Sequence, residues 1–188
     1  PKGMPKWMMI NSIEPSYFDE GTCYVAGTMY KSGDYAPYLY KTTDYGKTWK
    51  KITDGIPAEH FTRVVREDPQ QQGLLYAGTE NGMYISFNDG GSWKPFQLNL
   101  PLVPITDLYL RDNNLIVATQ GRSIYIIDDL TVLHQLYTMP EDTKTFLFKP
   151  MDTYRMSGGG RSGSLTSGAN HPGGVMTYFY LDDFDEKK

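Results

Sequence analysis

The chain has 188 residues, of which 18 are basic and 22 acidic, so its formal net charge is −4. No cluster of lysines and arginines occurs along it, which argues against nucleic acid and anionic membrane surfaces as partners. The apolar runs fall far short of the roughly 20 residues that cross a bilayer, so no transmembrane segment is expected. The single cysteine, Cys23, excludes an intrachain disulfide and a cysteine-based metal site.

The composition favours short strands and tight turns. The chain contains 15 Tyr, 8 Phe and 3 Trp alongside 19 Gly and 12 Pro. Aromatic residues are enriched in strands, whereas glycine and proline mark turns. The sequence starts at Pro1-Lys2-Gly3, with no initiating Met and no apolar signal segment. Such a start is typical of a processed product or of an excerpt from a longer protein.

The chain carries an internal repeat. The frame Ser/Thr-x-Asp/Asn-x-Gly-x-Ser/Thr-Trp occurs at residues 42–49 and again at residues 86–93, so Trp49 and Trp93 are 44 residues apart. Self-similarity with a period of about 40 to 50 residues is the signature of propeller blades. Two strand-like segments precede each copy, and residues 117–127 repeat them a third time. We therefore predict an all-β fold, a partial β-propeller of about three four-stranded blades.

Each blade is expected to follow the order inner, second, third and outer strand. In chain order, the first blade takes residues 8–13, 24–28, 38–42 and 48–52, the second takes 62–67, 76–79, 82–86 and 92–97, and the third takes 105–110, 117–119 and 123–127. Residues 145–149 are the best candidate for the outer strand of the third blade, and residues 29–37 form an inserted loop in the first. Because propellers have typically four to eight blades, the remaining blades are expected from the same polypeptide or from another chain.

The character of the sequence changes after residue 150. Residues 1–150 are assigned to the blades, residues 151–174 to a linker rich in glycine and serine, and residues 175–188 to the start of a further β domain. A phosphate-binding loop is the alternative interpretation of the glycine run at residues 157–164. That motif requires a preceding strand, a following helix and usually a lysine, which are not evident here.

The repeated frame has a structural interpretation. The hydroxyl at its first position and the carboxylate or amide two residues later cap backbone N–H groups in a hairpin turn, while glycine adopts a positive φ and tryptophan packs onto the sheet. These roles fall on Thr42, Asp44, Gly46, Thr48 and Trp49 in the first copy, and on Ser86, Asn88, Gly90, Ser92 and Trp93 in the second. A catalytic role for Asp44 is the less favoured alternative.

The two copies, together with residues 36–49, 65–69 and 118–129, resemble the bacterial Asp-box propeller proteins, also called bacterial neuraminidase repeat proteins, whose propeller is similar to that of sortilin. The resemblance runs from about residue 7 to residue 136. It implies a large extracytoplasmic propeller whose last blades are seen here, followed by a linker and an immunoglobulin-like domain. Members of this group are often labelled glycosyl hydrolases.

Two functions are open. The favoured one is a non-catalytic scaffold that binds protein or glycan, with Arg122, Tyr30 and Tyr35 as candidate ligand-binding residues. The alternative is a glycoside hydrolase whose carboxylate pair is shared with blades outside this chain, since such enzymes use two carboxylates roughly 5 to 9.5 Å apart. Its weak candidates are Asp34, Glu67 and Asp128.

Other kinds of site find little support. The three histidines, His60, His134 and His171, show no metal-ligand spacing, and neither a metal nor a cofactor is expected. The sequence contains enough arginines for the carboxylate clamp of a sialidase. However, it lacks the Arg-Ile-Pro signature that usually opens sialidase sequences, so sialidase activity is disfavoured.

Overall fold

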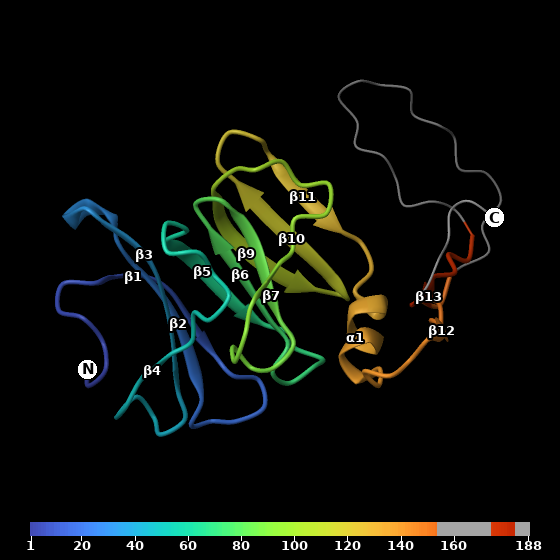
Figure 1. Cartoon of the computed structure of the whole chain (residues 1–188), viewed down its shortest axis with the longest axis horizontal. Coiled ribbons are helices and arrows are strands. Elements are labelled where there is room, and N and C mark those ends of the chain that lie inside the picture. The colour runs from blue at the N-terminus through green and yellow to red at the C-terminus, as the bar shows by residue number, and fades with distance from the viewer. Residues whose placement is uncertain (154–173, 183–188) are drawn as a thin grey trace. The chain divides into compact units, whose positions relative to one another are not determined.

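The computed structural model describes residues 1–153 and 174–182. Within it the chain divides into two compact units, Pro1–Ile127 and Asp128–Lys188 (Figure 1). Most of the expected linker, including the glycine run, lies outside the described residues, as do His171 and the acidic end of the chain.

The first unit begins with an antiparallel sheet, here called sheet 1, whose four strands follow one another in chain order. They are β1 (Met9–Pro15), β2 (Cys23–Met29), β3 (Asp34–Thr42) and β4 (Lys50–Lys51). The insertion expected between β2 and β3 is shorter than predicted, because Met29 pairs with Asp34 and β3 extends to that residue. Only the short 3-10 helix η1 (Tyr30–Ser32) remains outside the strands, and it ends at Gly33, whose φ is 78°.

Sheet 2 repeats this architecture. Its strands are β5 (Thr62–Glu67), β6 (Leu75–Thr79), β7 (Gly82–Ser86) and β8 (Lys94–Pro95), again antiparallel and in chain order. Every residue of β6 and β7 is buried, so both faces of this sheet are covered by neighbouring structure. The second predicted blade therefore has its strands close to the expected positions.

Sheet 3 has three strands, β9 (Ile105–Arg111), β10 (Asn114–Thr119) and β11 (Ile124–Ile127). The prediction that residues 145–149 form its outer strand was wrong. Residues 145–147 do form a strand, β12 (Thr145–Leu147), but it pairs with β13 (Phe179–Leu181) in the second unit. The second unit also contains α1 (Thr131–Thr138), which the sequence analysis did not predict. The Asp129 carboxylate accepts a hydrogen bond from the Thr131 N–H at 2.8 Å, at the start of this helix.

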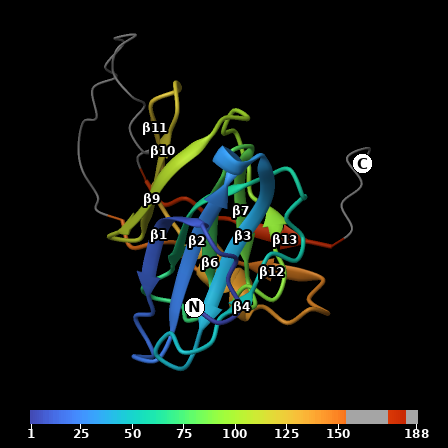
Figure 2. The same ribbon diagram turned by 90° about the vertical axis from the view of Figure 1, so that its left-hand side faces the viewer.

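The three sheets of the first unit pack in sequence, with the inner strands β1, β5 and β9 as neighbours (Figures 1 and 2). One buried cluster joins sheet 1 to sheet 2 through the side chains of Tyr24, Ala26 and Leu39 on one side and Val65, Leu75, Ala77, Tyr84 and Trp93 on the other. Burial of these apolar side chains, at about 25 cal/mol per Å², is the main term that holds the sheets together.

The segment that leads into each sheet also repeats. The Trp93 N–H donates to the Asp54 carbonyl at 2.8 Å, and the Trp49 N–H donates to the Lys2 carbonyl at 3.2 Å. The following residue is a glycine with positive φ in both cases, 89° at Gly55 and 99° at Gly3. Residues 2–5 therefore occupy, beside sheet 1, the place that residues 54–57 occupy beside sheet 2.

Candidate functional site

The turn at residues 42–49, here called turn 1, is closed by two side chains. Thr42 Oγ1 accepts a hydrogen bond from the Gly46 N–H at 3.0 Å and donates one to Asp44 Oδ1 at 2.8 Å. The Asp44 carboxylate accepts from the backbone N–H and the hydroxyl of Thr48, at 2.9 and 2.7 Å. Because these donors, the Thr48 N–H first, stabilise the ionised form, the pKa of Asp44 is lowered to about 2. Asp44 serves the turn as an ionised cap.

The turn at residues 86–93, turn 2, has the same hydrogen bonds with different atoms. Ser86 Oγ accepts from the Gly90 N–H at 3.0 Å, and Asn88 Oδ1 accepts from the Ser92 N–H at 2.8 Å. The Asn88 amide donates to Ser92 Oγ at 3.0 Å, where turn 1 has a hydroxyl donating to a carboxylate. The fold therefore needs an acceptor at this position, and a negative charge is dispensable.

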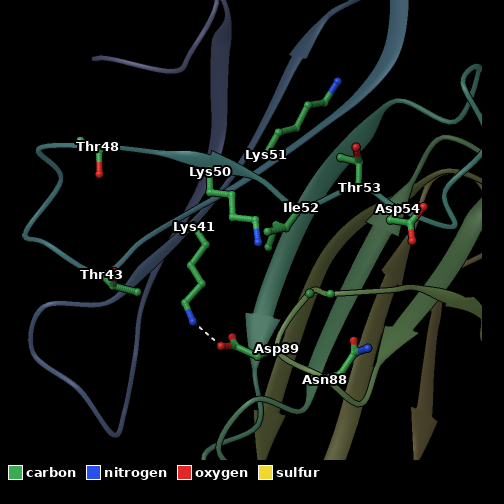
Figure 3. Close-up of a pocket in the computed structure, with 12 residues that line it drawn as sticks. Lys41, Thr43, Thr48, Lys50, Lys51, Ile52, Thr53, Asp54, Asn88 and Asp89 are labelled. Atoms are coloured by element: carbon green, nitrogen blue, oxygen red, sulfur yellow. Dashed lines mark hydrogen bonds and ion pairs between the residues drawn. The ribbon is translucent and has the colours of Figure 1, made fainter.

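A polar groove of about 460 Å³ lies between the two turns (Figure 3). Lys41 and Lys50 of sheet 1 line one side and Asp89 of turn 2 lines the other. Lys41 Nζ forms an ion pair with Asp89, which also accepts the Tyr24 hydroxyl at 2.6 Å. Lys50 points toward Ile52, whereas the neighbouring lysine of β4 points the opposite way (Figure 3). The groove thus combines cations with hydroxyl and amide groups.

A second polar cluster spans the inner strands of all three sheets, with Arg66 of β5 at its centre. The Arg66 guanidinium donates to Ser12 Oγ of β1 at 2.7 Å and to Asp107 Oδ1 of β9 at 2.7 Å. Its Nε donates to the Leu108 carbonyl at 2.9 Å, and Nη1 lies 3.6 Å from Glu14 Oε2. One side chain therefore connects sheets 1, 2 and 3.

Glu14 is the least satisfied member of this cluster. The residue is buried, and its Oε1 is inaccessible and has no hydrogen-bond partner among the described residues. Burial raises the pKa of Glu14, and the Arg66 charge only partly offsets that effect. Tyr17 and Tyr109 are exposed and lie in the same region. The pKa of Tyr17 is raised, mainly by partial burial and then by the nearby Glu14 and Tyr109.

The three predicted catalytic carboxylates belong to different elements. Asp34 caps the Ala36 N–H at 2.9 Å and accepts the Tyr38 hydroxyl, and these bonds, Tyr38 first, lower its pKa. Glu67 is fully buried and accepts from the Tyr17 N–H at 3.0 Å and the Tyr24 hydroxyl at 3.3 Å. Asp128 is exposed and belongs to the second unit. Asp34 and Glu67 therefore accept hydrogen bonds that stabilise the fold.

The predicted ligand-binding residues belong to two different sheets. Arg122 is exposed in the turn between β10 and β11. Tyr30 stacks on Phe61, the residue before β5, with ring centroids 5.2 Å apart, and is only partly exposed. Tyr35 is exposed and contacts the same ring at 6.1 Å. The two tyrosines therefore form one aromatic cluster with the buried ring of Phe61.

Sequence reasoning missed the role of Glu14 and of the Lys41–Asp89 pair. The only signal for Glu14 was a carboxylate inside an otherwise strand-like segment, where burial is expected for alternate residues. Within residues 1–153 and 174–182, no group of three or more histidine, cysteine, aspartate or glutamate side chains is placed to hold a metal ion. In the same part of the chain, no helix has the length and apolar character that a membrane crossing requires.

Comparison with known proteins identifies the architecture. No protein-family model matches the sequence, and no curated protein matches it significantly. Among solved structures, the GH74 xyloglucanase from Xanthomonas campestris aligns with a TM-score of 0.53 and 18% identity over 68% of this chain and 22% of that one. The GH74 enzyme from Niastella koreensis aligns with a TM-score of 0.51 and 16% identity over 64% of this chain and 21% of that one.

The chain thus spans about a fifth of the length of these two proteins. At such low identities the likeness establishes the fold alone. It agrees with the repeated antiparallel sheets, and sheets 1, 2 and 3 of this chain are blades of a β-propeller.

Proposed function

We propose that this chain supplies consecutive blades of an Asp-box propeller of the bacterial, sortilin-like type, and that the propeller acts outside the cytoplasm as a non-catalytic scaffold that binds protein or glycan. The hydrogen bonds of turns 1 and 2 support the Asp-box assignment, because both follow the roles of the repeated frame. Extracytoplasmic location rests on the family resemblance.

The observation that carries the binding role is the polar groove between the two turns. Its volume of about 460 Å³ lies within the usual range of ligand sites, roughly 300 to 1,000 Å³. Lys50 is exposed at this groove, whereas Lys41 is committed to Asp89. The groove therefore favours a ligand with an acidic group beside hydroxyls or amides, such as an acidic saccharide or an acidic peptide.

Binding is tested on the full chain with a panel of neutral and acidic oligosaccharides and acidic peptides, measured by biolayer interferometry. We expect Lys50→Glu to weaken capture of an acidic ligand at least tenfold, because it reverses the charge of an exposed lysine that points into the groove. Lys94→Glu is the matched control, since Lys94 holds the same position in β8 of sheet 2. Equal effects of the two substitutions would place the ligand elsewhere.

A glycoside hydrolase is the second candidate, and one observation favours it. Glu14, with a raised pKa, and Asp107, which is exposed, both contact the Arg66 guanidinium, so one buried and one exposed carboxyl group share this arginine. The aligned proteins named above are GH74 enzymes, one described as a xyloglucanase. Hydrolysis of xyloglucan that is lost in both Glu14→Gln and Asp107→Asn, and kept in Asp34→Asn, would reverse the preference for a scaffold.

A further inference from the structure

The polar groove between turns 1 and 2 carries an exposed cation and an exposed anion. Lys50 and Asp54 both line it, and both residues are exposed. In the sequence they flank Ile52, whose N–H donates to the Leu39 carbonyl at 2.9 Å and so continues the pairing of β4 with β3. Because four residues of chain span at most about 14 Å, one short ligand can reach both charges.

The other charged side chains of the lining are engaged elsewhere. Lys41 Nζ forms an ion pair with Asp89. Lys51 points the opposite way from Lys50 (Figure 3), and its Nζ lies 4.5 Å from the centre of an aromatic ring of β3. In the described part of the chain, neither Lys50 nor Asp54 forms an ion pair. Both charges therefore remain available to a ligand.

The corresponding place on sheet 2 lacks the anion. Lys50 and Lys94 hold the same position in β4 and β8. Two residues after each lysine, a backbone N–H donates at 2.9 Å to a carbonyl of the third strand of its sheet, so the correspondence extends beyond these short strands. Four residues after Lys94 stands Leu98, which is exposed, where sheet 1 has Asp54. The blade architecture therefore does not require the carboxylate.

The rest of the lining suits a peptide. It comes from residues 41–54 and 88–91, so two consecutive blades supply the walls. None of the described residues that line the groove is aromatic, whereas a saccharide site commonly offers a ring on which the C–H face of a sugar packs. Threonine hydroxyls and the Asn88 amide can hydrogen-bond a peptide main chain. Gly91 is exposed and has no side chain to keep that main chain at a distance.

We propose that the groove binds an extended peptide segment that carries one acidic and one basic side chain, the acid paired with Lys50 and the base with Asp54. Two opposite charges at a fixed separation select a ligand by the order and spacing of its own charges, which a single lysine cannot do. The inference rests on the proposed binding role and narrows its ligand to a peptide with both charges.

A random-peptide display library panned on the full chain tests this proposal. Selected peptides are expected to share an acidic and a basic residue at one spacing. Fluorescence anisotropy then measures how variants bind one such peptide. Lys50→Glu and Asp54→Lys should each weaken binding about tenfold, because each replaces an attraction by a repulsion. The double variant should bind a peptide whose two charged residues are exchanged, and the unchanged protein should bind that peptide poorly.

Lys94→Glu and Leu98→Lys are the matched controls, since they make the same changes on sheet 2. They should leave the affinity unchanged, and circular dichroism should show every variant folded. Tighter binding by Asp54→Lys would assign a purely acidic ligand to the groove, and capture of saccharides alone would assign it a glycan. Either result, or selected peptides that ignore both Lys50 and Asp54, would overturn the inference. Equal losses in Lys50→Glu and Lys94→Glu would instead contradict the proposed binding role itself.

Discussion

Two carboxyl groups show how surroundings set the charge of single residues in this chain. Asp44 lies in a turn whose donors favour the ionised form, and its pKa falls to about 2. Glu14 lies between two sheets, where burial raises its pKa despite the nearby Arg66. The first carboxylate therefore stabilises the fold once ionised, and the second opposes it.

Glu14→Gln is expected to stabilise the protein at pH 7. The pKa of Glu14 is higher in the folded protein than its unfolded value of 4.5, so the folded state binds more protons. The free energy of unfolding therefore falls as the pH rises from the unfolded to the folded pKa. The amide removes this loss, and the gain should be much smaller at pH 4, where the carboxyl is mostly protonated in both states. Urea unfolding at pH 4 and pH 7 measures the difference. An equal effect at both pH values would contradict the assignment.

The lowered pKa of Asp44 predicts the opposite dependence of stability on pH. Its contribution is present above the unfolded pKa of 3.8 and is lost as pH falls toward 2. Asp44→Asn should retain most of the stability at pH 7, because turn 2 already uses Asn88 in this role, and it should lose the acid sensitivity of the turn. Asp44→Ala should lower the melting temperature at pH 7, since it leaves the Thr48 N–H without its acceptor. Differential scanning fluorimetry from pH 2 to pH 7 separates the two variants.

At the scale of elements, the connections between sheets are as constrained as the strands. Gly55 has a φ of 89°, and a Cβ placed there would overlap the carbonyl oxygen of Trp93. Gly33, in the turn before β3, has a φ of 78° with no atom within 4 Å of such a Cβ. The two glycines share a backbone conformation and differ in the space around it.

Alanine substitutions should separate the cost of the left-handed backbone conformation from the cost of the steric clash. Gly33→Ala is expected to cost about 1 kcal/mol, the penalty of a left-handed conformation for an L-residue. Gly55→Ala adds a steric clash with the backbone and should cost about 3 kcal/mol. Urea denaturation with a constant m-value measures both. Similar losses at the two positions would show that the connection moves to relieve the clash.

At the scale of the whole first unit, the sheets are coupled by a small number of polar bridges through an apolar core. Arg66 touches residues of sheets 1 and 3 from sheet 2, and Tyr24 reaches from sheet 1 to two carboxylates of sheet 2. Burial raises the pKa of Tyr24, as do the neighbouring carboxylates, so its hydroxyl stays a donor. These bridges fix how one blade is seated on the next.

Arg66→Met is expected to destabilise the chain by about 3 kcal/mol, because it leaves the Glu14 carboxyl buried without its cationic partner. Arg63→Met is the matched control on the same strand. Arg63 pairs with Glu80 near the surface at 2.5 Å, and the loss of such a pair should cost no more than about 1 kcal/mol. Chemical denaturation measures both free energies. A smaller loss for Arg66→Met than for Arg63→Met would contradict the bridging role.

The sequence predicted the local part of the fold well. The strands β5 and β7 coincide with residues 62–67 and 82–86, because period-two patterns and turn residues are local signals. The partner of residues 145–147 was missed, since a strand pattern does not specify which edge the strand joins. The cluster around Arg66 was missed for a similar reason, because Ser12 and Arg66 are 54 residues apart.

By itself the sequence determined the repeat, the turns and the all-β architecture, since the hydrogen bonds of turns 1 and 2 join residues no more than four positions apart. Only the tertiary structure decided which carboxylates are buried, that Lys41 pairs with Asp89 across two sheets, and that Arg66 bridges three. Those properties depend on packing between sheets, where solvent is excluded by residues distant in the chain. The physical reason is that burial and pairing are set by neighbours in space, whereas turn chemistry is set by neighbours in sequence.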